Sequence, residues 1–90
     1  MYQDEPATQY DHYRIAKTHE KQGRFDEALQ SYAKAIHMDE DYAYAWYYKG
    51  LLHQKLGQNQ EAVRCAERAL KLEPKWEKHV QKIIEECSRK

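Results

Sequence analysis

The fold is decided by residues 43–76, which read AYAWYYKGLLHQKLGQNQEAVRCAERALKLEPKW. Residues 9–42 show the same pattern one period of 34 residues earlier, and small residues match especially well between the two segments. A period of this length is typical of solenoids, which stack one supersecondary unit many times. The identical pairs are Tyr10/Tyr44, Tyr13/Tyr47, His19/His53, Lys21/Lys55, Gly23/Gly57, Glu27/Glu61, Ala28/Ala62 and Ala35/Ala69.

A glycine divides each unit into two helical patterns. Gly23 and Gly57 stand where a helix ends in a left-handed conformation. After each glycine, apolar residues recur with a period near 3.6, which predicts an amphipathic helix. We expect Asp26 and Asn59 to cap these second helices. The apolar stripes are Ala28, Leu29, Tyr32, Ala35 and Ile36 in the first unit, and Ala62, Val63, Ala66, Ala69 and Leu70 in the second.

A fifth helix is predicted after Pro74, over Trp76 to Ser88. Its apolar stripe leaves the remaining surface charged, as expected for a helix that closes the array rather than continues it. Ile84 supports this interpretation because it replaces the small Ala16 and Gly50 of the other first helices. The stripe consists of Trp76, Val80, Ile83, Ile84 and Cys87. The predicted organisation is therefore an N-terminal extension (1–8), two repeats (9–42 and 43–76) and a C-terminal capping helix (77–90).

These residues resemble the tetratricopeptide repeat (TPR) family. The second unit carries the family's signature residues at Trp46, Gly50, Ala62, Ala69 and Pro74. The first unit keeps Ala16, Ala28, Tyr32 and Ala35, but has His12 for the usual Trp and Glu40 for the usual Pro. The resemblance implies an all-α, right-handed solenoid of two antiparallel helix pairs plus the capping helix. It also implies that the first helix of each pair lines a concave groove for extended peptides or partner helices.

Composition narrows the classes of partner. Fifteen Lys and Arg offset fifteen Asp and Glu, so the chain lacks the basic excess typical of proteins that bind nucleic acid. No apolar run approaches the length of a membrane span, and the N-terminal residues have no secretory pattern. The two cysteines, Cys65 and Cys87, form no disulfide or CxxC pattern. We therefore expect a cytoplasmic protein with reduced thiols that binds neither nucleic acid nor membrane.

A helical wheel places tyrosines and lysines on the groove side of the first helices. Rings that stand outside the core often mark interaction surfaces, although they also serve as packing residues. The fifth helix continues the row with two polar residues. The candidate partner-binding residues are Tyr10, Tyr13, Lys17, Tyr44, Tyr47, Leu51, Gln81 and Glu85.

The resemblance suggests one specific ligand to consider, because a subclass of the family binds a partner's C-terminal carboxylate with Lys, Asn and Arg. Of the aligned positions only Lys17 is basic, and Leu51 replaces the amide. Capture of a carboxylate requires convergent charged donors, so we do not expect this clamp here.

Catalytic and metal-binding patterns are absent from the sequence. The histidines lack HExxH or zinc-finger spacing, and we interpret His12, His19 and His53 as half-buried core residues. Ser31 and Ser88 have no GxSxG context, and the chain has no glycine-rich phosphate loop. We expect no enzymatic activity, cofactor or metal.

The sequence thus predicts a non-catalytic protein-binding module. The alternative is a homo-oligomeric adaptor that self-associates through the same surface, because two repeats are few for a stable solenoid.

Overall fold

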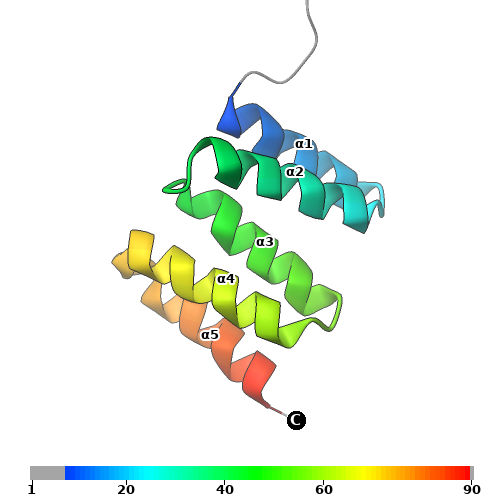
Figure 1. Ribbon diagram of the computed structural model, residues 1–90. Coiled ribbons are helices and arrows are strands. Elements are labelled where there is room, and N and C mark those ends of the chain that lie inside the picture. The colour runs from blue at the N-terminus through cyan, green and yellow to red at the C-terminus, as the bar shows by residue number, and fades with distance from the viewer. Residues whose placement is uncertain (1–7, 90) are drawn as a thin grey trace, which may run out of the picture.

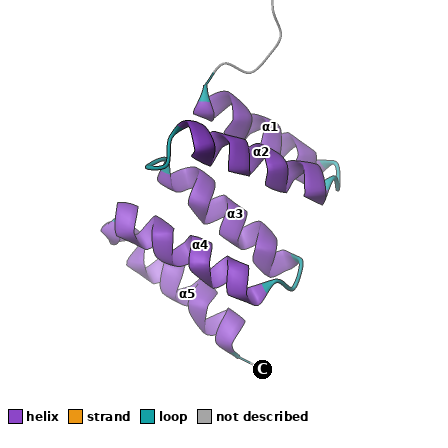
Figure 2. Ribbon diagram, viewed as in Figure 1, coloured by secondary structure: helices purple, strands orange, loops and turns teal. Residues whose placement is uncertain are grey.

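The computed structural model describes residues 8–89, and within this range the structure is helical without strands (Figures 1 and 2). The predicted all-α class is therefore confirmed. Residues 1–7 of the predicted N-terminal extension lie outside the described part of the chain. A 3₁₀ turn, Pro74–Trp76, precedes the last helix. The helices are α1 (Gln9–Lys21), α2 (Phe25–Met38), α3 (Ala43–Lys55), α4 (Asn59–Leu72) and α5 (Glu77–Ser88).

Gly23 and Gly57 end the first helix of each pair, as the sequence predicts. Their φ angles are +77° and +79°, in the left-handed region that glycine adopts without steric strain. The amide of Arg24 donates to the His19 carbonyl oxygen over 2.9 Å, and that of Gly23 donates to the Glu20 oxygen over 3.0 Å. This pair of hydrogen bonds is a Schellman motif, which satisfies the last carbonyls of α1. The same motif recurs at Gly57.

The predicted N-caps of the second helices are wrong. Helix α2 begins at Phe25 after Arg24, and α4 begins at Asn59 after Gln58, without a side-chain cap in either case. The reason is the short Schellman turn, after which the Arg24 carbonyl already accepts from the Ala28 amide. Asp26 consequently lies in the first turn of α2, where its negative charge interacts favourably with the positive end of the helix dipole.

Helix α1 begins with a capping box that its counterpart lacks. The Thr8 hydroxyl accepts from the Asp11 amide, and the Asp11 carboxylate accepts from the Thr8 amide, each over 3.2 Å. The residue 34 positions later is Tyr42, and α3 has no side-chain cap. The box satisfies two otherwise unpaired backbone donors at the N-terminal edge of the array.

The helices stack as two antiparallel pairs and a final helix. Helix α1 packs on α2 and α3 on α4, while α2 contacts α3 and α4 contacts α5. In Figure 1, α2 lies in front of α1 and α4 in front of α5, with α3 between the two halves. Helices α1, α3 and α5 therefore lie on one side of the molecule, which we call the first-helix face. No helix of the described residues is long and apolar enough to cross a membrane.

Two core clusters hold the stack together, and they differ in the size of their side chains. The first cluster is built around the fully buried Tyr32 and Leu52, which pack against Ala16 and Ala28. The Tyr32 hydroxyl donates to the Glu20 carboxylate.

Close approach of α3 to α4 requires a small residue at Gly50, where a Cβ atom would lie 3.2 Å from the Ala62 carbonyl oxygen and from Cys65 Cβ.

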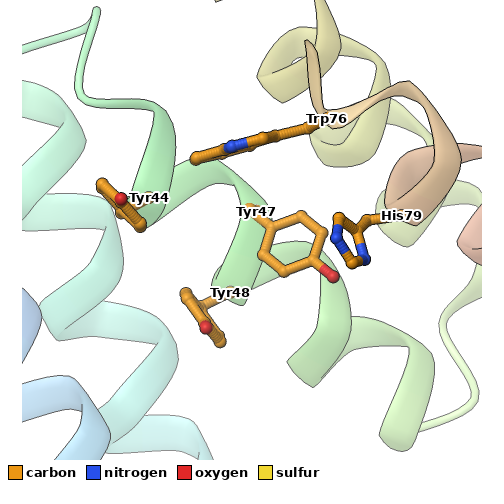
Figure 3. Close-up of a pocket in the computed structure, with 5 residues that line it drawn as sticks. All are labelled: Tyr44, Tyr47, Tyr48, Trp76 and His79. Carbon is orange, nitrogen blue, oxygen red and sulfur yellow. The ribbon is translucent and has the colours of Figure 1, made fainter. Parts of the chain in front are cut away.

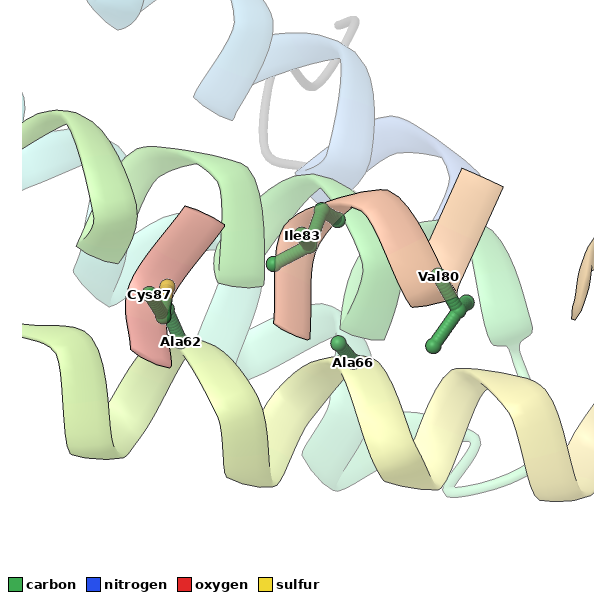
Figure 4. Close-up of a cluster of buried hydrophobic side chains, with 5 residues drawn as sticks. All are labelled: Ala62, Ala66, Val80, Ile83 and Cys87. Atoms are coloured by element: carbon green, nitrogen blue, oxygen red, sulfur yellow. The ribbon is translucent and has the colours of Figure 1, made fainter. Parts of the chain in front are cut away.

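The second cluster joins α4 to α5. Ala62 and Ala66 of α4 face Val80, Ile83 and Cys87 of α5, as Figure 4 shows. These side chains are almost completely buried, and complete burial of a side chain such as Val80 contributes about 1.5–3 kcal/mol. The predicted apolar stripe thus packs on the second pair, and the residues between its members are exposed.

Candidate functional site

Tyrosine rings from both repeats gather on the first-helix face. Tyr13 of α1 lies at the centre, with its ring centroid 5.7–6.3 Å from five others. Burial among these rings raises the pKa of Tyr13 to about 12, and neighbouring phenols, Tyr48 first, add to the effect. The surrounding rings are Tyr10, Tyr32, Tyr42, Tyr44 and Tyr48. Around Tyr13 the face is therefore densely packed.

One period later the rings enclose an open cavity of about 210 Å³ between α3 and α5. Trp76 packs against two of its tyrosines, with centroids 5.0 Å from Tyr44 and 5.6 Å from Tyr47. Tyr44 is 52% exposed, so the cavity is reachable from solvent. We call this cavity the aromatic pocket, and its lining residues are Tyr44, Tyr47, Tyr48, Trp76 and His79 (Figure 3).

A second cavity of about 460 Å³ adjoins the aromatic pocket at Tyr48. The Lys17 ammonium lies 3.7 Å from the Tyr48 ring centroid, and Lys55 lies 5.5 Å from the Phe25 ring centroid. The Gln54 amide donates to the Glu86 carboxylate over 2.7 Å and so links α3 to α5 across the cavity. We call it the lysine cavity; it is lined by Lys17, Glu20, Tyr48, Leu51, Gln54, Lys55 and Glu86.

The structure distributes the eight candidate residues among four places. Tyr44 and Tyr47 line the aromatic pocket, and Lys17 and Leu51 line the lysine cavity. Tyr13 lies in the packed ring cluster, with the exposed Tyr10 beside it at the N-terminal edge. Gln81 and Glu85 are exposed and line neither cavity.

Helix α5 presents His79 and Glu86 to the cavities in place of Gln81 and Glu85. The physical reason is the face with which α5 docks on α4. Its buried Val80, Ile83 and Cys87 align with Trp46, Lys49 and His53 of α3. Helix α3, however, turns Tyr48 and Leu52 toward the first repeat. Helix α5 is therefore turned about its axis relative to α3, and the 34-residue alignment does not transfer.

Three residues of the aromatic pocket were not among the eight candidates, each for a different reason. Tyr48 follows Tyr47 directly, and the wheel does not show that both rings reach the first-helix face. Trp76 aligns with Tyr42, whose ring contacts Tyr13 in the first repeat. This equivalence could have indicated that Trp76 contacts Tyr47 in the second repeat. His79 aligns with the buried Ala45 and gives no such signal.

The chemistry of both cavities is that of recognition. Burial raises the pKa of Tyr47, chiefly by desolvation, and the phenol stays protonated at neutral pH. Each of the two lysine-cavity carboxylates accepts an internal hydrogen bond, Glu20 from Tyr32 and Glu86 from Gln54. The cavities thus offer ring faces on one side of Tyr48 and ammonium groups on the other.

A polar cluster between α3 and α4 lies apart from these cavities. His53 Nδ1 and Gln58 Oε1 are 2.6 Å apart, and Lys49 Nζ lies 3.4 Å from His53 Nε2 and 3.8 Å from Cys65 Sγ. Burial raises the pKa of Cys65, and the Lys49 ammonium opposes this shift. Among residues 8–89, no group of three or more His, Cys, Asp or Glu side chains could hold a metal ion.

Stacked helix pairs with a side-chain-lined face define a helical repeat protein. Two family models match the chain, one described as TPR repeat over residues 16–57 and one as tetratricopeptide repeat over residues 43–75. The chain belongs to the tetratricopeptide repeat family, as its repeat pattern suggested. Repeats of this family generally mediate protein–protein interaction.

Solved structures agree on the fold. A crystal structure of MamA protein superposes with a TM-score of 0.77 at 17% identity, covering 90% of this chain and 49% of that one. A second MamA crystal structure gives a TM-score of 0.74 at 17% identity, covering 89% of this chain and 56% of that one. This chain therefore spans about half the length of those structures. No curated protein gave a significant sequence match.

Proposed function

We propose that this chain is a non-catalytic module that binds a peptide or helix of a partner protein on the first-helix face. One observation carries the proposal, namely that two cavities of different chemistry adjoin on that face and share Tyr48. An aromatic pocket beside a charged cavity resembles the mixed apolar and polar character of protein interfaces, in which Tyr and Trp are enriched.

The two cavities define what the ligand must carry. The aromatic pocket takes a side chain that suits ring faces. In the lysine cavity, Lys17 and Lys55 contact rings, and a ring face leaves ammonium N–H donors available for an acceptor. We therefore propose a ligand that places a ring-binding side chain next to an acidic residue.

The nucleophilic side chains of the chain also support a binding rather than a catalytic role. Ser31 is buried within α2, and burial raises the pKa of the Cys65 and Cys87 thiols, which disfavours the reactive thiolate. Neither cavity contains an Asp, Ser or Cys side chain. We propose a protein or peptide as the partner, in preference to nucleic acid, and a cytoplasmic location stays a prediction.

The test is to select peptides against the intact chain from a display library and to measure their affinity for variants. Tyr47→Ala removes the ring between the pocket and the core, and we expect a loss of about 2 kcal/mol or more of binding free energy. Lys17→Glu reverses a charge in the lysine cavity and should weaken acidic peptides selectively. Circular dichroism on both variants checks that the helices persist.

Arg68→Ala is the matched control, because Arg68 stacks on Trp46, 5.2 Å from its ring centroid, and lines neither cavity. Equal peptide affinity for the wild type and for both first-helix-face variants would contradict the proposal. Sedimentation at several concentrations separates partner binding from the alternative. A dimer that Tyr47→Ala dissociates would assign this face to self-association instead.

A further inference from the structure

The rings of the aromatic pocket are arranged as a floor and walls. The Tyr47 ring makes interplanar angles of 85° with Tyr48 and 59° with Trp76, and Trp76 makes 61° with Tyr44. In Figure 3 the Tyr47 ring faces the viewer, and the rings of Trp76, Tyr44 and Tyr48 stand around it more nearly edge-on, with His79 opposite Tyr48. Tyr47 meets Tyr48, and Trp76 meets Tyr44, edge to face, and the pocket is lined by these aromatic rings, whose faces carry negative electrostatic potential.

Several aromatic rings of the chain contact a Lys or Arg side chain through cation–π geometry. Arg14 lies 5.2 Å from the Tyr10 ring centroid and Arg68 lies 5.2 Å from that of Trp46. Lys17, which lines the lysine cavity, lies 3.7 Å from the Tyr48 centroid, so a ring shared by both cavities already contacts an ammonium group. Among the described residues, Tyr44, Tyr47 and Trp76 have no such cation. Trp76 therefore presents its ring to the pocket beside two tyrosine rings but, within residues 8–89, without a cation of the chain over it.

The lining selects the kind of cation. It contains no carboxylate, and its polar atoms are confined to phenol, indole and imidazole groups. A primary ammonium is strongly hydrated and needs three acceptors, which these side chains do not supply. A trimethylated ammonium has no N–H donor and loses little on leaving water. The cavity of about 210 Å³ is well above the roughly 10–15 Å³ that one water needs, so it has room for this group of five non-hydrogen atoms, counting the attached methylene.

We propose that the aromatic pocket binds a trimethylammonium group, carried by a trimethylated lysine of the partner protein. The choice of a lysine rests on the proposed function, because the neighbouring lysine cavity would receive an acidic residue of the same peptide. Recognition of quaternary ammonium by converging aromatic rings is an established use of cation–π attraction. A choline head group offers the same chemistry from a different source.

The first experiment uses free ligands with the intact chain. Choline is compared with 3,3-dimethyl-1-butanol, which has the same shape without the charge, by following the methyl proton resonance of each in NMR titrations. We expect choline to bind about fivefold more tightly or better, with an upfield shift from the ring currents. Equal affinity of the two ligands, or no binding of choline, would overturn the proposal.

Two variants exploit the repeat for a matched control. Tyr44→Leu keeps apolar surface but removes a ring face, and Tyr44 is 52% exposed, so the fold should tolerate the change. Tyr10→Leu makes the same change at the equivalent residue, which is 54% exposed and lies outside the pocket. We expect Tyr44→Leu to weaken choline binding about threefold or more without affecting the neutral alcohol. Tyr10→Leu should change neither, and equal loss in both variants would contradict the pocket.

The source of the trimethylammonium group is resolved by comparing three further ligands. A trimethyllysine peptide with a neighbouring glutamate should bind more tightly than phosphocholine and than the same peptide with unmodified lysine. Tighter binding of phosphocholine would overturn the assignment to a protein partner. If choline fails while display-selected peptides still depend on Tyr47 and Lys17, the trimethylammonium site is wrong and the proposed function stands.

Discussion

Tyr13 and Tyr47 occupy equivalent positions of the two repeats but have different surroundings. Tyr13 contacts five tyrosine rings and lines neither the aromatic pocket nor the lysine cavity. Tyr47 contacts two rings, Tyr48 and Trp76, and lines a cavity of about 210 Å³. The difference arises in the helix that follows. Helix α3 supplies the rings of Tyr44 and Tyr48 to the first repeat, whereas α5 presents His79 and Glu86, which are smaller or polar, to the second.

The aromatic pocket forms between α3 and α5, where the helix that follows the second repeat lacks the tyrosines of α3. The second repeat covers the aromatic row of the first through Tyr44 and Tyr48. Helix α5 packs on the core through Val80 and Ile83 and leaves Tyr44 52% exposed. Stability and binding therefore make different demands on the two halves, and variants can test each half separately.

The largest expected effect is on the first core cluster. Tyr32 is fully buried, whereas its equivalent in the second repeat is Ala66. Tyr32→Ala should reduce the free energy of unfolding by about 3–5 kcal/mol, because it creates a large cavity between α1, α2 and α3. Urea denaturation followed by circular dichroism measures the loss. Tyr32→Phe removes only the hydrogen bond to Glu20 and should cost about 1 kcal/mol. Similar losses in both variants would mean that packing around Tyr32 is loose.

The second core cluster should respond to added volume instead. Ala62 is fully buried between α3, α4 and α5, so Ala62→Leu should overpack the cluster and cost about 1–3 kcal/mol. Ala33→Leu is the control, since Ala33 is exposed in the middle of α2. Thermal unfolding of the two variants measures the difference. An unchanged midpoint for Ala62→Leu would show that α5 does not dock on α4 as described.

The smallest effect at neutral pH concerns the packed tyrosine row. The pKa of Tyr13 rises from 10.0 to about 12 in the folded chain, so the folded state holds this proton more tightly than the unfolded state. The corresponding stability is present below pH 10 and is lost as the pH rises toward 12. Tyr13→Phe should raise the midpoint of alkaline unfolding, monitored by tyrosinate absorbance and circular dichroism. A midpoint that is unchanged or lower would contradict the burial of this phenol.

Much of the fold could be predicted because the repeat is encoded locally. Gly23 and Gly57 fix both helix ends, and matched alanines fix the packed faces of α2 and α4. The N-caps could not be derived in the same way. Asp26 is a good capping residue, but the Schellman turn starts α2 before the chain reaches it.

The candidate site could be predicted only in part, because its second half depends on docking. The helical period correctly indicates that Tyr44 and Tyr47 share a face, because they lie three residues apart on the same helix. It could not indicate that α5 turns His79 and Glu86 toward the cavities, because that orientation follows from how Val80 and Ile83 fit Ala62 and Ala66. Periodicity carries no information on such a rotation once the repeat ends.

The most direct test of the central claim uses the two indole N–H resonances in a nitrogen–proton correlation spectrum. Trp76 lines the aromatic pocket, whereas the Trp46 indole donates to the Glu40 carbonyl over 2.9 Å and stacks under Arg68. Trp46→Phe assigns the two peaks. On titration with a display-selected peptide, we expect the Trp76 peak to shift to saturation at the measured affinity while the Trp46 peak stays in place. A saturating shift of Trp46 with an unmoved Trp76 would place the binding site on the other side of the molecule and contradict the account.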